Sequence, residues 1–128
     1  MRLLFDTHLL LWIAYDSARV PKACRALLDD PEHTLLFSAA SIWEVAVKQT
    51  KSRADFTADA TLLRSELLEA DYLEVLISGR QAAAVSALPP IHADAFDRLL
   101  MAQALTEGLT LVTSDSRLAR YPGPIRLV

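Results

Sequence analysis

Short apolar runs alternate with longer amphipathic segments along this chain. The runs predict buried strands at Arg2–Phe5 and at residues 34–37, 73–77 and 109–112, with a last edge strand at 125–128. Between them, spacing, caps and prolines predict helices at residues 7–14, 21–29, 39–50, 57–70, 78–87 and 94–107, and a helical turn at 115–119. This order predicts an α/β fold, with a mostly parallel central sheet covered by helices on both faces. We expect one domain spanning residues 1–128.

Composition narrows the class of protein further. Hydrophobic residues make up 52% of the chain and charged residues 23%, which predicts a folded globular protein. The single cysteine, Cys24, excludes an internal disulfide and favours a cytoplasmic location. The apolar run at residues 3–14 contains Asp6 and is too short to cross a bilayer, so no membrane association is expected. The net charge of −3 leaves nucleic-acid binding undecided, because metal-binding carboxylates would account for the excess.

Two aspartates directly follow predicted strands. Asp6 comes after RLLF, and Asp115 comes after LTLVTS. In parallel sheets, ligands bind beyond the carboxyl ends of the strands, so both residues are candidate metal ligands. For a lone aspartate at such a position, helix capping is the commoner explanation.

Two further acids lie where apolar residues are expected. Glu44 is the only charged residue in AASIWEVAV, and Asp97 leads a helical stripe of apolar residues. A charge on a buried face needs a partner, which is either a cation in a site or a basic side chain. Lys48, one turn beyond Glu44, and Arg98, next to Asp97, are the candidate basic partners.

Four carboxylates in one cleft repel each other unless cations lie among them. Oxygen ligands of this kind suit Mg²⁺ or Mn²⁺, so the sequence predicts a site for one of these ions at Asp6, Glu44, Asp97 and Asp115. The three histidines lack the spacing of a zinc site. We interpret His8, His33 and His92 as surface or loop residues.

Four ordered blocks resemble the PIN-domain ribonucleases, and specifically the VapC-like toxins of toxin–antitoxin pairs. The blocks are FDTHLLLW, SAASIWEVAVK, LPPIHADAFDRLLMAQAL and LTLVTSD. Ala95 replaces the proline that is usual in the third block, which removes a stiff helix start but no chemistry. The resemblance spans nearly the whole chain from Asp6 onward.

The resemblance implies a PIN-like fold and Mg²⁺- or Mn²⁺-dependent hydrolysis of RNA by Asp6, Glu44, Asp97 and Asp115. It implies supporting roles in orienting carboxylates or water for Thr7, Asp94, Thr113 and Ser114. It also implies an RNA substrate, an inhibitory antitoxin and a homodimer. Because an acidic pocket repels RNA, cations must hold the RNA backbone. The candidates are Lys48, Lys51, Arg53, Arg80, Arg98 and Arg117.

Two other functions compete with this interpretation. An aspartate-nucleophile phosphohydrolase normally needs a second acid two residues after the first, where this chain has His8, and it gives Glu44 no role. A catalytically inactive PIN-like interaction module would not need four intact acids. Trp12 and Trp43 could belong to the core or to an interface, and we expect the core for both.

Overall fold

The computed structural model describes residues 1–51 and 58–128. Five strands form one parallel sheet in the order β3-β2-β1-β4-β5. Adjacent strands pair in parallel throughout the sheet. The strands are β1 (Arg2–Phe5), β2 (Thr34–Ser38), β3 (Leu73–Val75), β4 (Thr110–Thr113) and β5 (Ile125–Leu127). The predicted α/β sheet is therefore confirmed, including its last edge strand.

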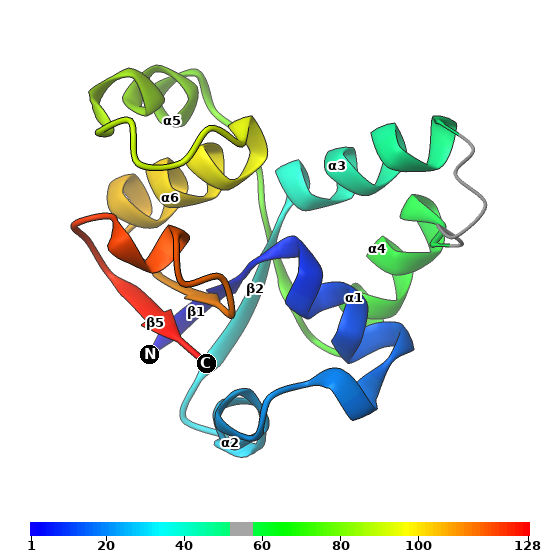
Figure 1. Ribbon diagram of the computed structural model, residues 1–128. Helices are drawn as coiled ribbons and strands as arrows, with labels where there is room; N and C mark the ends of the chain where they lie inside the picture. The colour runs from blue at the N-terminus through cyan, green and yellow to red at the C-terminus, as the bar shows by residue number, and fades with distance from the viewer. Residues whose placement is uncertain (52–57) are drawn as a thin grey trace.

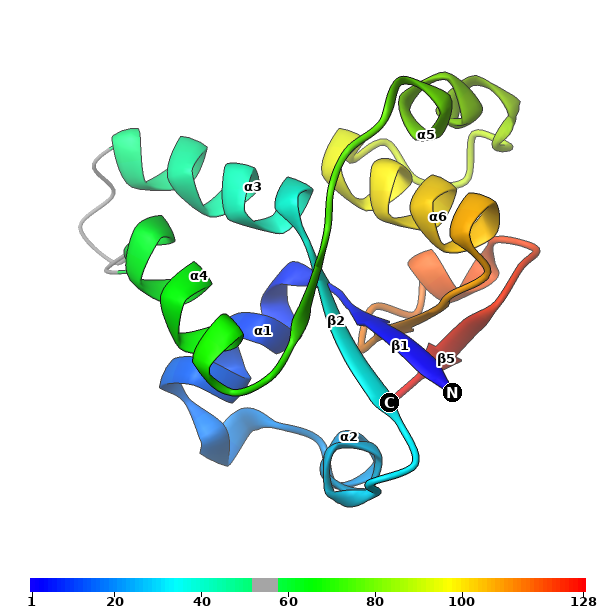
Figure 2. The ribbon, with the colours of Figure 1, turned by 180° about the vertical axis from the view of Figure 1, so that it is seen from behind.

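The helices cover both faces of this sheet (Figures 1 and 2). The α-helices are α1 (Thr7–Tyr15), α2 (Lys22–Asp29), α3 (Ala39–Thr50), α4 (Ala60–Glu69), α5 (Gly79–Ala84) and α6 (Ala95–Glu107). Three short 3-10 turns complete the described elements: η1 (Ser17–Arg19), η2 (Val85–Ala87) and η3 (Leu118–Arg120).

Alternation along the central strand divides the core into two clusters. Leu3 and Phe5 of β1 point into the cluster formed with α1, α2 and α4, whereas Leu4 points into the cluster formed with α6 and η3. Helix α3 contributes to both, through Val45 in the first cluster and Ala40 in the second. Both faces of the sheet are thus buried, as an all-parallel sheet requires.

Several boundaries differ from the sequence predictions. Strand β3 ends at Val75 because it pairs only with the last three residues of β2. The helix predicted at 78–87 is an α-helix followed by the 3-10 turn η2, just before Pro89 and Pro90. The helical turn predicted at 115–119 begins later than expected, because the structure has only the short η3 there, which starts at Leu118. The predicted start of the fourth helix, at residue 57, lies outside the described residues.

Individual caps explain where the helices begin and end. Asp6, Ser38 and Asp94 accept hydrogen bonds from the first turns of α1, α3 and α6. Gly108 ends α6 in the left-handed conformation, at φ 67°. Among the described helices, none is long and apolar enough to cross a bilayer.

Candidate active site

The four predicted acids come from four elements that meet at the carboxyl edge of the sheet. Asp6 follows β1, Glu44 lies in α3, Asp97 lies in the first turn of α6, and Asp115 follows β4. Asp6 caps α1, so this residue is both a cap and a member of the cluster. The two interpretations that the sequence left open therefore do not exclude each other.

Thr113 joins two of these acids. Its hydroxyl, fully buried, donates a hydrogen bond to Oδ2 of Asp6 and accepts one from the backbone N–H of Asp115 at 3.0 Å. Directly after Asp6 in the chain, the buried Thr7 donates a hydrogen bond to Oγ of Ser41 at 2.9 Å, which ties α1 to α3. Both threonines thus fix the elements that carry the acids.

Glu44 carries an unpartnered buried oxygen. The side chain is 5% exposed, and its Oε2 accepts a hydrogen bond from Nζ of Lys48 at 2.8 Å. Among the described residues, nothing donates a hydrogen bond to its buried Oε1. A buried carboxylate oxygen without a donor is costly, so this atom points to a cation or a donor from outside the chain.

The neighbouring acids raise the pKa of Asp97. Burial, together with the negative charge of Asp94, raises its pKa to about 6, and the charges of Asp6 and Glu44 add to this shift. A hydrogen bond with His92 acts in the opposite direction. Carboxylates that shift each other's pKa in this way lie within one electrostatic cluster.

The two strand-end aspartates differ in their pKa. Burial raises the pKa of Asp6, against the hydrogen bonds from Thr113 and the backbone N–H of Leu9. For Asp115, partial burial raises the pKa, but hydrogen bonds from the backbone and side chain of Arg117 outweigh this effect and lower it below its usual range. The cluster therefore holds one aspartate that favours the charged form and two that resist it.

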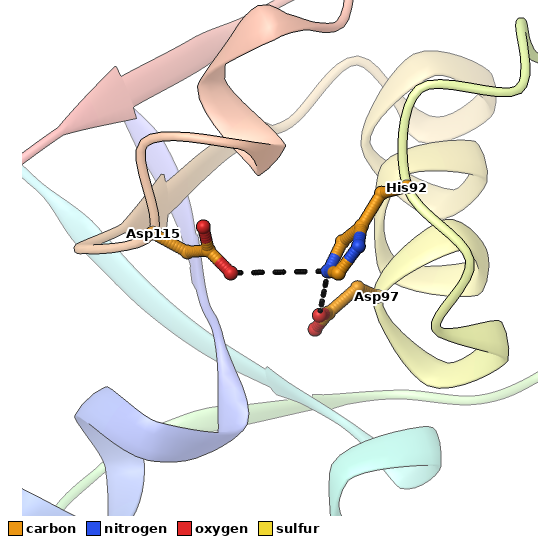
Figure 3. A group of neighbouring side chains, drawn as sticks. All are labelled: His92, Asp97 and Asp115. Carbon is orange, nitrogen blue, oxygen red and sulfur yellow. Dashed lines mark hydrogen bonds and ion pairs between the residues drawn. The ribbon is translucent and has the colours of Figure 1, made fainter.

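A histidine lies between two of the acids (Figure 3). Nε2 of His92 lies 2.9 Å from Oδ2 of Asp97 and 3.8 Å from Oδ2 of Asp115. Its side chain is only 9% exposed, so of the two places expected for His92, surface or loop, only the loop is correct. The backbone of His92 is in a loop, but the imidazole faces the acids. The sequence signal that could have pointed to His92 is its position five residues before Asp97.

Arg98 and Tyr121 hold the loop that carries His92. The hydroxyl of Tyr121 accepts hydrogen bonds from the backbone N–H of His92 and from Arg98, both at 2.9 Å, and donates to the carbonyl of His92 at 3.2 Å. Arg98 also donates to the carbonyls of Pro89 and Val85. Its guanidinium therefore braces this loop and does not neutralise Asp97, which was the alternative considered from the sequence.

Replacing Tyr121 by phenylalanine is expected to lower the free energy of unfolding by about 1–3 kcal/mol, because the partly buried backbone N–H and carbonyl of His92 lose their partner. Urea denaturation measures the change. Tyr15→Phe is the matched control, because Tyr15 is 45% exposed and its replacement should cost less than about 0.5 kcal/mol. Equal stability of the Tyr121 variant and the wild type would show that the hydroxyl does not support the loop.

The remaining predicted residues have varied surroundings. Asp94 caps α6 by accepting from the backbone N–H of Asp97 at 3.0 Å. Ser114 is half-buried, and Lys51 and Arg80 are exposed. Arg117 pairs with Asp115 at 3.4 Å. Arg53 lies outside the described residues.

The two tryptophans also differ. Trp12 is half-buried and packs against the core, as predicted, but Trp43 is 55% exposed, so its expected place in the core was wrong. Trp43 lies directly before Glu44 on α3. Its exposure follows from the helical turn of about 100° per residue: Glu44 is buried, and its neighbour is turned away from the core.

The donor set fits a divalent cation. One ligand atom from each of His92, Asp97 and Asp115 lies within 4.8 Å of the other two. Oε1 of Glu44 has no hydrogen-bond donor among the described residues, and burial together with the nearby carboxylates raises the pKa of Asp97. Mostly oxygen donors suit a hard ion such as Mg²⁺ or Mn²⁺.

Comparisons with known proteins identify the family and the fold of this chain. Residues 3–124 match the family described as PIN domain. No curated protein matches the sequence significantly.

Solved toxin–antitoxin complexes contain chains with the same fold. A chain of VapBC2 from Rickettsia felis, bound to promoter DNA, has a TM-score of 0.74 at 16% identity, over 100% of this chain and 99% of that chain. A toxin–antitoxin complex from Klebsiella pneumoniae gives 0.66 at 20% identity, over 97% and 95%. VapBC-1 from nontypeable Haemophilus influenzae gives 0.60 at 17% identity, over 99% and 98%. At these identities the likeness is one of fold.

Proposed function

The chain belongs to the PIN-domain family, and from this membership and its acidic site we propose that it is a metal-dependent endoribonuclease. The observation that carries the proposal is the buried Oε1 of Glu44, which has no donor among the described residues and belongs to a cluster of four acids. A bound cation would relieve the repulsion within such an arrangement, and RNA hydrolysis is the reaction that the resemblance of the sequence blocks implies.

Asp6, Glu44, Asp97 and Asp115 would hold Mg²⁺ or Mn²⁺, with His92 beside two of them. When bound, the ion supplies Lewis-acid chemistry, which activates water and stabilises charge on the phosphate. The chain itself fixes the geometry. Thr113 holds Asp6, and the loop braced by Arg98 and Tyr121 holds His92 against Asp97.

Exposed basic side chains would hold the RNA backbone next to this acidic site. Lys51 and Arg80 are exposed and suit this role. Lys48 and Arg117 already pair with acids of the cluster, so they would serve a phosphate only by sharing their charge. Arg98 is engaged with backbone carbonyls and is not part of the proposed RNA contact.

We further propose that the protein is the toxin of a toxin–antitoxin pair, with a cognate antitoxin as inhibitor and a homodimer as its assembly. The sequence blocks support this role, and so does the fold shared with chains of VapBC complexes. A purified complex with the protein encoded next to it, and inhibition of RNA cleavage by that protein, are the expected results.

Cleavage of RNA tests the enzymatic proposal. Purified protein should cut RNA with Mg²⁺ or Mn²⁺, lose the activity in excess chelator, and regain it when the ion is restored. Full activity in chelator would contradict the metal mechanism. Hydrolysis of a simple phosphomonoester without any cleavage of RNA would favour the phosphohydrolase instead.

Replacing Thr113 by valine is expected to weaken binding of Mn²⁺ by about 10- to 100-fold, because the hydroxyl that orients Asp6 is lost while the side-chain volume is kept. Calorimetric titration of Mn²⁺ measures this. Thr113→Ser keeps the hydroxyl and should bind nearly as the wild type does. Unchanged affinity in the valine variant would show that Thr113 serves only the fold.

A further inference from the structure

A nitrogen donor lies among the oxygen donors of the acidic cluster (Figure 3). Asp97 lies in the first turn of α6, Asp115 follows β4, and His92 belongs to the loop before α6. The imidazole of His92 lies between the two carboxylates, with Nε2 at 2.9 Å from Oδ2 of Asp97 and at 3.8 Å from Oδ2 of Asp115. The sequence analysis gave this histidine no role in the site, and the proposed function uses only the acids as ligands.

The separations between these atoms are those of ligands on a single ion. In octahedral coordination at about 2.0–2.1 Å, adjacent ligand atoms lie roughly 2.8–3.0 Å apart and opposite ones roughly 4.0–4.2 Å apart. The distance from His92 to Asp97 matches adjacent ligands, and the distance from His92 to Asp115 lies between the two values. One ion could therefore contact all three residues.

The fold fixes the imidazole before any ion binds. The hydroxyl of Tyr121 bonds to both the backbone N–H and the carbonyl of His92, at 2.9 and 3.2 Å, and Arg98 donates a hydrogen bond to the same hydroxyl. The His92 side chain is almost fully buried, which limits its motion further. A ligand that is already in place loses little conformational entropy when it binds.

A hydrogen bond to Asp97 is the simpler role for His92, but it leaves part of the cluster unexplained. It does not account for the position of the imidazole between Asp97 and Asp115, which come from different elements. It also leaves Oε1 of Glu44 buried and without a donor among the described residues. Glu44 belongs to the same cluster, because its charge acts on Asp97. An ion shared by His92 and the acids would answer both points.

We propose that His92 is a ligand of the ion, and that its nitrogen makes the site prefer a first-row transition ion such as Mn²⁺ to Mg²⁺. Mg²⁺ binds oxygen ligands and gives up its water reluctantly, whereas imidazole suits transition ions. This inference rests on the proposed metal-dependent function, and it names the class of ion that serves the site.

Pulsed electron paramagnetic resonance of the Mn²⁺-loaded wild type tests the ligand directly. A coordinated imidazole nitrogen modulates the electron spin echo strongly, and a nitrogen outside the coordination sphere couples far more weakly. The wild type should show the strong modulation, and His92→Gln should lose it. His8→Gln is the matched control, because His8 is exposed on α1 and should not contribute. Bound Mn²⁺ without strong nitrogen modulation in the wild type would overturn the proposal.

Competition between the two ions measures the selectivity. Mg²⁺ added to the Mn²⁺-loaded protein releases Mn²⁺, and the free-ion signal gives the ratio of the two affinities. The variant His92→Gln still offers Asp97 a hydrogen bond but has no imidazole nitrogen. It should therefore lower the preference for Mn²⁺ over Mg²⁺ about tenfold, mainly through weaker binding of Mn²⁺. An unchanged ratio in His92→Gln would reduce His92 to a support for Asp97.

This inference and the ribonuclease proposal fail in different ways. If the wild type binds Mn²⁺ and cleaves RNA without strong nitrogen modulation, only the role of His92 is wrong. If the modulation is present but RNA is not cleaved, His92 is a ligand and the ion serves another reaction. If neither ion binds, both proposals are wrong.

Discussion

Replacing Asp97 by asparagine is expected to reduce RNA cleavage by about a thousandfold while the protein stays folded. The charges of Asp6, Glu44 and Asp94 raise the pKa of Asp97. Its carboxylate also contacts His92. The neutral amide keeps the shape of the side chain but removes a charged ligand. A loss of several kcal/mol of transition-state stabilisation corresponds to this factor.

The rate is measured under single-turnover conditions in saturating Mn²⁺. Asp59→Asn is the matched control, because Asp59 caps α4 through the backbone N–H of Leu62 and asparagine caps equally well. This control should cleave RNA as the wild type does. Cleavage by Asp97→Asn within tenfold of the wild type would exclude Asp97 from the catalytic site.

The same substitution is expected to stabilise the protein in chelator at neutral pH. The pKa of Asp97 is about 6 in the folded protein and 3.8 in the unfolded chain, so the folded state binds the proton more tightly. Between these two values, stability therefore falls as pH rises, because the folded protein must carry an unfavourable charge. The penalty at neutral pH is about 2 kcal/mol, since the side chain is 22% exposed and partly screened.

Urea denaturation of wild type and Asp97→Asn, below and above this pH window, measures the effect. The two proteins should be similarly stable near pH 4, and the variant should be more stable at neutral pH. Adding Mn²⁺ at neutral pH should stabilise the wild type and leave the variant nearly unchanged. If the difference in free energy of unfolding between the two proteins stays constant across this pH range, the fold does not disfavour the charged form of Asp97.

Local patterns in the sequence were enough to predict the sheet and to single out Glu44 as an unusual acid. Leu3, Leu4 and Phe5 form a run too short for a helix and apolar on both faces, which is the signature of a central parallel strand. Glu44 stood out because no orientation of its helix places it on a broad polar face, and the structure leaves one of its oxygens buried without a donor among the described residues. These features depend only on periodicity and on the cost of burying charge.

Contacts between distant parts of the chain were beyond such reasoning. His92 turns toward Asp97 because Tyr121, 29 residues later, holds its backbone. Arg98 looked like a partner for an acid or for RNA, but its guanidinium fits the carbonyls of the loop before α6. The contact of Trp43 with Phe96 likewise depends on where α6 packs against α3.

Binding of Mn²⁺, followed by electron paramagnetic resonance, tests most directly that the four acids form a metal site. The wild type should bind the ion with loss of the free-ion signal, and Glu44→Gln and Asp6→Asn should each bind it at least tenfold more weakly. Asp59→Asn should bind as the wild type does. Equal Mn²⁺ affinity in the wild type, Glu44→Gln and Asp6→Asn would contradict the account, because the ion would then be held elsewhere.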